Sequence, residues 1–212
     1  MFGDWLPVAM DYAELLVTDG IERGLIGPAE APRIWSRHIL NCAVIHPAIP
    51  AGSTVADIGS GAGLPGVVLS IVRPDLDMTL VEPTRRRADF LAEVAAELGL
   101  AGVVVRRARA EELAGELHVD VVTARAVAPM ARLAQWALPL LNPGGRLLAV
   151  KGRSVHAEIE RAVPILRALD AASWDVTEYG SGVVDPPTRV AVVEVGTGVR
   201  QAGPRPRTKG RT

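Results

Sequence analysis

The chain has 212 residues, of which 49% are hydrophobic, and its formal net charge is −1. This composition supports one well-packed domain with at most a modest extension, and it excludes a wholly disordered chain. No apolar run reaches the roughly 20 residues that a membrane span needs. The first ten residues, MFGDWLPVAM, carry an acid in place of the basic start of a secretion signal. We therefore expect a cytoplasmic protein with no membrane association.

Cysteine and lysine are both scarce. The single cysteine, Cys42, excludes an intramolecular disulfide and a cysteine-based zinc cluster, so we expect no metal site. Lys151 and Lys209 are the only lysines among 23 basic residues. Arginine suits phosphate and guanine recognition, but a genome rich in arginine codons is the larger cause of this bias. Local clusters of charge must therefore indicate the partner.

Residues 1 to about 50 are predicted to be helical, because apolar residues recur there at helical spacing. The two periodic groups are separated by Gly27-Pro28 and are closed by Pro47 and Pro50. The apolar positions are Leu6, Ala9, Met10, Ala13, Leu16 and Val17 in the first group, and Ile34, Trp35, Ile39 and Leu40 in the second.

From Thr54 onward, short apolar runs alternate with longer periodic segments. The runs predict buried strands at 54–58, 78–82, 102–107, 119–125 and 146–152. The segments between them predict crossovers at 64–72, 86–99, 110–117 and 129–141. This alternation is typical of parallel strands with helices on both faces of the sheet.

A last helix is predicted at 155–169, and two further strands follow at 174–180 and 189–195. Only a proline-bearing loop separates these two strands, which favours an antiparallel hairpin at the sheet edge. The fold class is therefore α/β: a doubly wound, mostly parallel seven-stranded sheet of the class I S-adenosylmethionine-dependent methyltransferase type. We divide the chain into an N-terminal helical extension (1–50), a methyltransferase domain (51–197) and a basic tail (198–212) that we expect to be disordered.

The sharpest motif is the glycine-rich stretch from Val55 to Gly66. A strand ends there, Gly59, Gly61 and Gly63 turn the chain tightly, and a helix begins near Pro65. Ligands of open α/β sheets bind at the carboxyl ends of the strands. So many glycines are costly unless a ligand approaches the backbone, so we expect a cofactor here.

The same stretch also contains GxGxxG, with Glu82 at a suitable distance for a ribose, so an NAD-dependent oxidoreductase remains an alternative. Charge favours S-adenosylmethionine. A carboxylate of Asp57 at the mouth of the turn would oppose a pyrophosphate at the helix start and attract an ammonium and a sulfonium. We expect Glu82 to accept both ribose hydroxyls, although a solvated strand-end acid is the simpler role. Ala110 and Glu111 follow the third strand, where the adenine should lie.

The type of methyl transfer is indicated by what the fourth strand lacks. The segment 123–129 has no Asn/Asp-Pro-Pro-aromatic motif for exocyclic amines, and Cys42 lies far along the chain from the sheet edge, where a carbon-methylating nucleophile would be needed. A ring nitrogen such as guanine N7 has a free lone pair in the neutral base. Holding it in line with the methyl group can supply about 7–11 kcal/mol at best.

Basic residues at strand ends are the candidates for positioning and RNA contact. Arg125 is expected against the cofactor or the target base, and Lys151 with Arg153 against phosphate. Either Arg125 or Lys151 could instead form a salt bridge with Glu82 or Glu111. The run Arg85–Arg87 opens a helix at this edge, as an RNA contact or as a solvated face. Aromatic residues are too few for stacking on single strands, which favours a structured RNA.

Five segments together resemble one family, the RsmG (glucose-inhibited division protein B) family, over residues 5–195. The segments are Trp35–Leu40, Asp57–Gly66, Glu82 with Arg86–Arg87, Arg125–Ala128 and Lys151–Gly152. The resemblance implies a guanine-N7 methyltransferase for a loop of 16S ribosomal RNA near the decoding centre, whose loss is associated with low-level streptomycin resistance. It also implies cofactor contacts at Gly59, Leu64, Ala110, Glu111 and Arg125.

We add Arg37, His38 and Arg86 to Lys151 and Arg153 as candidate RNA contacts, with a structural role for His38 equally open. The chain departs from the family where Asn41-Cys42 replaces the usual Asp-Ser and Arg86-Arg87 replaces Lys-Arg. The partner is expected to be 16S rRNA, free or in a small subunit or its precursor, and the protein a monomer. A small-molecule methyltransferase and a non-catalytic RNA-binding module remain alternatives.

Overall fold

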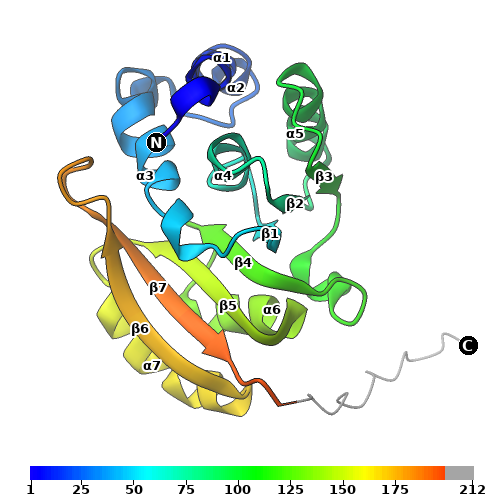
Figure 1. Cartoon of the computed structure of the whole chain (residues 1–212), viewed down its shortest axis with the longest axis vertical. Coiled ribbons are helices and arrows are strands. Elements are labelled where there is room, and N and C mark those ends of the chain that lie inside the picture. The colour runs from blue at the N-terminus through cyan, green and yellow to red at the C-terminus, as the bar shows by residue number, and fades with distance from the viewer. Residues whose placement is uncertain (199–212) are drawn as a thin grey trace, which may run out of the picture.

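The computed structural model describes residues 1–198 and arranges them around one seven-stranded sheet (Figure 1). The strand order is β3-β2-β1-β4-β5-β7-β6. The strands are β1 (Thr54–Ile58), β2 (Asp77–Val81), β3 (Val103–Arg106), β4 (Val119–Arg125), β5 (Leu141–Lys151), β6 (Ala171–Tyr179) and β7 (Thr188–Val195). The tail predicted over 198–212 lies outside the described residues except for Gly198.

The pairing within the sheet confirms the predicted topology. Strands β3, β2, β1, β4 and β5 run parallel, whereas β7 lies antiparallel between β5 and β6. The predicted strand limits agree closely with the observed ones except in β5, which begins at Leu141 and not at Arg146, and in β6, which begins at Ala171 and not at Trp174. The turn-like sequence around Pro143 still runs beside β4, where Leu141 pairs with Val119.

Helices cover both faces of the sheet, as expected for a doubly wound fold. The crossover helices are α4 (Gly66–Val72), α5 (Arg85–Glu97), α6 (Met130–Ala137) and α7 (Val155–Ala168). Helices α4 and α5 pack into one hydrophobic cluster, and α6 and α7 into a second cluster. The short crossover predicted at 110–117 contains a 3₁₀ turn, η5 (Ala110–Leu113), and no α-helix.

The N-terminal segment is irregular, and it lies over α4 in Figure 1. It comprises η1 (Gly3–Trp5), α1 (Leu6–Val17), α2 (Asp19–Glu22), η2 (Pro28–Arg33), the π-helical turn η3 (Ile34–Ile39), α3 (Leu40–Ala43) and η4 (His46–Ala48). Its buried residues belong to the same cluster as those of α4 and α5. The predicted helical extension therefore packs into the core of the sheet domain.

The buried face of α1 differs from the predicted one. Leu6 and Met10 are 45% and 56% exposed. Ala9, Ala13 and Leu16 are buried as expected, and Tyr12 is buried with them. Tyr12 is fully buried, and its hydroxyl finds a hydrogen-bond partner in the interior, as described below. Among residues 1–198, no helix combines the length and apolar character needed to cross a bilayer.

Candidate active site at the carboxyl edge of the sheet

The expected site residues come together because parallel strands end at one edge of the sheet. Asp57 belongs to β1, Glu82 follows β2, and Arg125 and Lys151 end β4 and β5. The N-terminal segment reaches this edge as well, since His38 of η3 contacts Arg125. The site is therefore built from the sheet and from residues 1–50 together.

Asp57 lies inside the protein and not at the mouth of the turn, which corrects the sequence-based interpretation. Its side chain is fully buried. The hydroxyl of Thr123 donates to Asp57 Oδ1 (2.9 Å), and the Gly66 N–H at the start of α4 donates to Oδ2 (3.2 Å). Burial raises the pKa of Asp57 to about 6. The carboxylate therefore ties β1, β4 and the glycine turn together and presents no charge at the surface.

Two glycines of the turn are required by close packing. A Cβ on Gly66 would lie 2.8 Å from the Cβ of Asp57. Gly63 has a φ of +100°, and a Cβ there would lie 2.7 Å from the hydroxyl oxygen of Tyr12. Any larger residue at these positions would move the turn away from β1 or from α1. The glycine motif thus allows the turn to pack closely as well as to approach a ligand.

Tyr12 is the residue that fastens α1 to this turn. It is fully buried, and its hydroxyl donates to the carbonyl of Ala62 at 2.8 Å. Burial raises the pKa of Tyr12 well above its ordinary value, so the hydroxyl keeps its proton and remains a donor. A residue 50 positions upstream therefore fixes the backbone between Gly61 and Gly63.

Glu82 also supports the turn. It is 2% exposed. Its Oε2 accepts the Gly61 N–H at 3.0 Å, and its Oε1 accepts the Thr84 N–H at 2.9 Å. A carboxylate has about four acceptor positions, so each oxygen retains one for a further donor such as a ribose hydroxyl.

The two acids after β3 have different roles. Glu112 closes the start of η5, where its Oε2 accepts the Arg109 N–H at 3.0 Å. Glu111 is exposed and makes no hydrogen bond or ion pair within residues 1–198, whereas Ala110 is 9% exposed. Of these two acids, Glu111 is therefore the one whose carboxylate can accept a hydrogen bond from a ligand beside β3.

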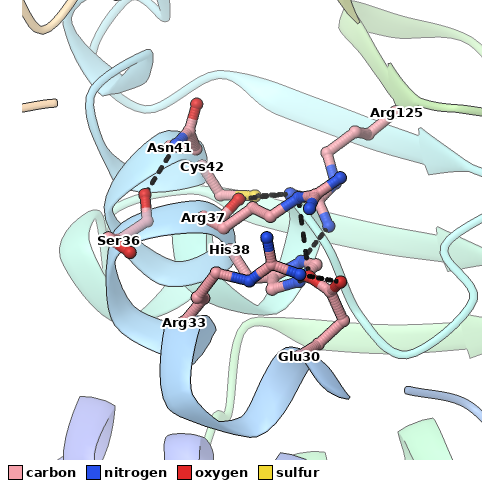
Figure 2. A network of polar contacts seen from close by, with 8 residues as sticks. All are labelled: Glu30, Arg33, Ser36, Arg37, His38, Asn41, Cys42 and Arg125. Atoms are coloured by element: carbon pink, nitrogen blue, oxygen red, sulfur yellow. Dashed lines mark hydrogen bonds and ion pairs between the residues drawn. The ribbon is translucent and has the colours of Figure 1, made fainter. Parts of the chain in front are cut away.

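Arg125 is held by the N-terminal segment, as Figure 2 shows. Its Nη2 contacts His38 Nδ1 at 2.5 Å, and its Nη1 donates to the carbonyl of Arg37 at 3.3 Å. The other ring nitrogen of His38, Nε2, lies 2.8 Å from Glu30 Oε2. His38 is 8% exposed. Neither ring nitrogen is available to RNA in this arrangement, so the structure favours the structural role for His38.

Cys42 lies beside the same guanidinium, although the sequence suggested that it was remote from the site. Arg125 Nη1 is 3.6 Å from Cys42 Sγ. Burial raises the pKa of the thiol to about 11, so it stays protonated and weakly nucleophilic. Cys42 is a free and fully buried cysteine.

Lys151 is paired inside the protein, which contradicts its assignment to phosphate. Its side chain is 8% exposed. Its Nζ donates to the carbonyl of Ala128 at 2.6 Å and to Glu158 Oε2 at 2.9 Å. The acid that pairs with Lys151 is Glu158 of α7, and not Glu82 or Glu111 as the sequence allowed. Lys151 therefore anchors the loop after β4 to the start of α7.

A pocket of about 610 Å³ opens beside this ion pair, between the ends of β4 and β5 and the start of α7. It is lined by residues 125–129, by residues 150–152, and by Ser154, Glu158 and Arg161. Its volume lies within the range of small-ligand sites. Within the described residues, no three His, Cys, Asp or Glu side chains are grouped as metal ligands.

The remaining basic candidates are accessible. Arg86 and Arg153 are exposed, and each follows the carboxyl end of a strand. The Arg37 side chain is 57% exposed, with Nε 3.5 Å from Glu30 Oε2. Arg86 and Arg153 follow strands that end at the edge that carries Arg125, and the Arg37 carbonyl contacts Arg125 itself. All three side chains are exposed and can therefore approach a large ligand.

Comparison with known proteins assigns the family. The sequence model described as "rRNA small subunit methyltransferase G" matches residues 6–179. The chain belongs to the rRNA small subunit methyltransferase G family. It is 54% identical to the ribosomal RNA small subunit methyltransferase G of Salinispora tropica, over 100% of this chain and 90% of that protein. It is 55% identical to the protein of that name from Thermobifida fusca, over 93% of this chain and 83% of the relative.

Solved structures confirm the fold assigned to this member of the methyltransferase G family. A putative S-adenosylmethionine-dependent methyltransferase from Methanococcus maripaludis superposes with a TM-score of 0.58 at 16% identity, over 92% of this chain and 94% of that chain. An S-adenosylmethionine-dependent O-methyltransferase from Thermotoga maritima also gives 0.58 at 16% identity, over 76% of this chain and 66% of that chain. At these identities the likeness shows the fold alone.

The departure Asn41-Cys42 from the methyltransferase G family pattern has a local explanation. The hydroxyl of Thr188, at the start of β7, donates to Asn41 Oδ1 at 2.7 Å, and Asn41 Nδ2 donates to the carbonyl of Ser36 at 2.7 Å. An aspartate would accept the same hydroxyl but could not donate to Ser36. Asn41 therefore joins the N-terminal segment to the sheet with both ends of its amide.

Sequence reasoning missed three residues of this family member's site: Tyr12, Glu30 and Thr123. A tyrosine on the apolar face of a helix is a usable signal, because a buried hydroxyl needs a partner. Glu30 and Thr123 carried no comparable signal. Glu30 lies in a segment rich in proline and alanine, and Thr123 lies in a strand whose other residues before Arg125 are mostly apolar.

Proposed function

We propose that this chain transfers a methyl group from S-adenosylmethionine to N7 of a guanine in 16S ribosomal RNA. The observation that carries the proposal is the family match across residues 6–179, which covers the glycine turn, the Glu82 edge and the Arg125 loop. The resemblance noted in the sequence implies the same base, the same nitrogen and a loop near the decoding centre. We take the chain to act as a monomer on the RNA or on a subunit particle.

The residues present fit S-adenosylmethionine better than a dinucleotide. Glu82 retains acceptor capacity for a ribose diol beside Gly61. The Gly66 N–H at the start of α4 is already bound by Asp57, so it is not free for the pyrophosphate that a dinucleotide places at such a helix start. Asp57 thus disfavours a dinucleotide by occupying this donor. Asp57 does not have to repel a pyrophosphate from the protein surface, as the sequence analysis expected.

Methyl transfer to N7 requires little acid–base catalysis by the protein. When bound, the cofactor supplies a methyl group on a positively charged sulfur. Guanine N7 carries a lone pair in the neutral base, so no side chain has to remove a proton. The work of this chain is then to orient the base, with Arg125 and the pocket after β4 at the point of transfer. Orientation of this kind can lower a barrier by several kcal/mol.

A small-molecule methyltransferase would share the core and the cofactor edge. The accessible guanidiniums of Arg37, Arg86 and Arg153 favour RNA, because they lie around the edge and outside the pocket. The direct test incubates the protein and labelled S-adenosylmethionine with small ribosomal subunits from a strain that lacks the family enzyme. We expect label in 16S rRNA, recovered as N7-methylguanosine. Label confined to nuclease-resistant metabolites would instead identify a small-molecule enzyme.

The RNA contacts can be separated from the buried ion pair by salt dependence. Each phosphate contact that is lost lowers the slope of log K against log salt by about one. We expect the double variant Arg86→Ala/Arg153→Ala to bind 16S rRNA less tightly and to lose about two units of slope, because both side chains are exposed. Filter binding over a series of salt concentrations measures both the affinity and the slope.

Lys151→Ala is the matched variant for this measurement. The variant removes one positive charge at the same edge, but this charge is paired inside the protein, so we expect an unchanged slope. Because Glu158 loses its ion-pair partner, we expect a loss of about 2 kcal/mol in unfolding free energy. A slope that falls with Lys151→Ala and not with the double variant would reverse these assignments.

A further inference from the structure

Glu30, His38 and Arg125 form a continuous chain of contacts from the N-terminal segment to the sheet (Figure 2). Glu30 Oε2 lies 2.8 Å from His38 Nε2, and His38 Nδ1 lies 2.5 Å from Arg125 Nη2. Glu30 belongs to η2 and His38 to η3, whereas Arg125 ends β4 and lines the pocket. The contact between His38 and Arg125 therefore joins residues 87 positions apart at the site.

Donor and acceptor capacity fixes the protonation of the imidazole. A guanidinium only donates, so His38 Nδ1 must be the acceptor and carry no proton. Nε2 must then carry the proton and donate a hydrogen bond to the carboxylate of Glu30. This is the neutral imidazole in a single tautomer, set by its two neighbours.

The surroundings favour this neutral form. The charged groups that face His38 are Glu30, Arg37 and Arg125. Burial lowers the pKa of His38, although the hydrogen bond with Glu30 opposes the shift. The same hydrogen bond, with help from Arg33 and Arg37, lowers the pKa of Glu30 and keeps its carboxylate charged. A charged acceptor at Nε2 and a cationic donor at Nδ1 are thus both present at neutral pH.

The network leaves part of Arg125 free for the site. Contacts with His38, the Arg37 carbonyl and Cys42 account for three of its N–H groups within the described chain. A guanidinium has five, in a rigid planar fork. Holding three of them fixes the direction of the other two, so the N-terminal segment sets where Arg125 donates.

We propose that Glu30 and neutral His38 are positioning residues that hold Arg125 in the orientation needed for methyl transfer. The proposal rests on the proposed function, because it takes the edge that carries Arg125 to be the methyl-transfer site. Protonation of His38 would turn Nδ1 from acceptor to donor, opposite a guanidinium, and would release Arg125. The site is therefore organised in neutral solution and loosened in acid.

The tautomer is tested first, by nuclear magnetic resonance of the full chain labelled with ¹⁵N-histidine. We expect the His38 signal to show an unprotonated Nδ1 and a protonated Nε2, and Glu30→Ala to remove this preference. His118, which is exposed, is the internal reference. A protonated Nδ1 in the wild-type protein would overturn the proposal, since Arg125 could not then be held.

Coupling to the site is tested by calorimetry with S-adenosylhomocysteine at pH 7.5. We expect His38→Ala to weaken binding about tenfold, and His38→Asn, whose Oδ1 takes the place of Nδ1 as acceptor, to restore it within about threefold. In an Arg125→Ala background, His38→Ala should have no further effect. Additive losses, or equal losses for the alanine and asparagine variants, would overturn the positioning role.

A pH series completes the test. Binding by the wild type should fall between pH 7 and pH 5 more steeply than binding by His38→Asn, which cannot titrate; parallel curves would contradict the proposal. None of these measurements uses RNA. Failure of the rRNA labelling experiment would therefore reject the proposed function and leave the coupling of His38 to Arg125 intact, whereas the reverse result would reject only the positioning role.

Discussion

Glu82→Ala is expected to weaken binding of S-adenosylhomocysteine by about 100-fold. The carboxylate accepts the Gly61 and Thr84 N–H groups and is placed to accept two ribose hydroxyls as well. Hydrogen bonds to a charged acceptor contribute about 1.5–3 kcal/mol each, and 1.4 kcal/mol is a factor of ten in affinity. Loosening of the turn adds to this loss, because Gly61 loses its partner. Isothermal titration calorimetry measures the change directly.

A modified ligand separates ribose recognition from damage to the turn. The wild-type protein should prefer S-adenosylhomocysteine to its 2′,3′-dideoxy analogue by at least tenfold, whereas Glu82→Ala should bind the two almost equally. Glu116→Ala is the matched control, since Glu116 is 70% exposed and lies 4.0 Å from Arg106 at the sheet surface. If Glu82→Ala kept the preference for the intact ribose, another residue would have to bind the diol.

The sheet could be predicted from the sequence because its signals are local. Each strand of the parallel core is a short run of β-branched and apolar residues bounded by turns, and glycines mark where β1 ends. The boundary of β5 was misplaced for the same reason. Pro143 and two glycines indicate a turn locally, yet Leu141 pairs with Val119 of the neighbouring strand. Tertiary pairing outweighed the local signal.

The carboxyl edge was predicted, but the roles within it were not. The strand-end positions of Glu82 and Arg125 follow from the sheet topology, and the alternation of strands and helices along the sequence predicts that topology. Partners across long loops do not follow from spacing: Tyr12 bonds to Ala62, and His38 to Arg125. Burial was also invisible, and it turned Lys151 from a candidate phosphate ligand into half of an internal ion pair. Hydrogen-bond capacity and exposure decide these roles, and both require coordinates.

The stability of the wild-type protein is expected to fall relative to Asp57→Asn as the pH rises from about 4 to about 6. Burial raises the pKa of Asp57 from 3.8 to about 6, so the folded state binds this proton more tightly than the unfolded chain does. Between these two values the unfolded chain releases the proton first, and the folded state is disfavoured. The full difference is about 3 kcal/mol, since one pKa unit corresponds to about 1.4 kcal/mol. Urea unfolding at several pH values measures it.

Comparison with two further variants isolates this carboxylate from the other acids. Asp89→Asn alters an exposed side chain on α5, so its stability should run parallel to the wild type at every pH. Asp57→Ala removes both acceptors and leaves the Thr123 hydroxyl and the Gly66 N–H unpaired, at a cost of about 3 kcal/mol relative to the wild type near pH 4. A constant difference between wild type and Asp57→Asn from pH 4 to pH 7 would show that Asp57 titrates normally. The hydrogen bonds that Thr123 and Gly66 donate to the carboxylate would then fully offset the effect of burial on its pKa, and the expected loss of stability between pH 4 and pH 6 would be absent.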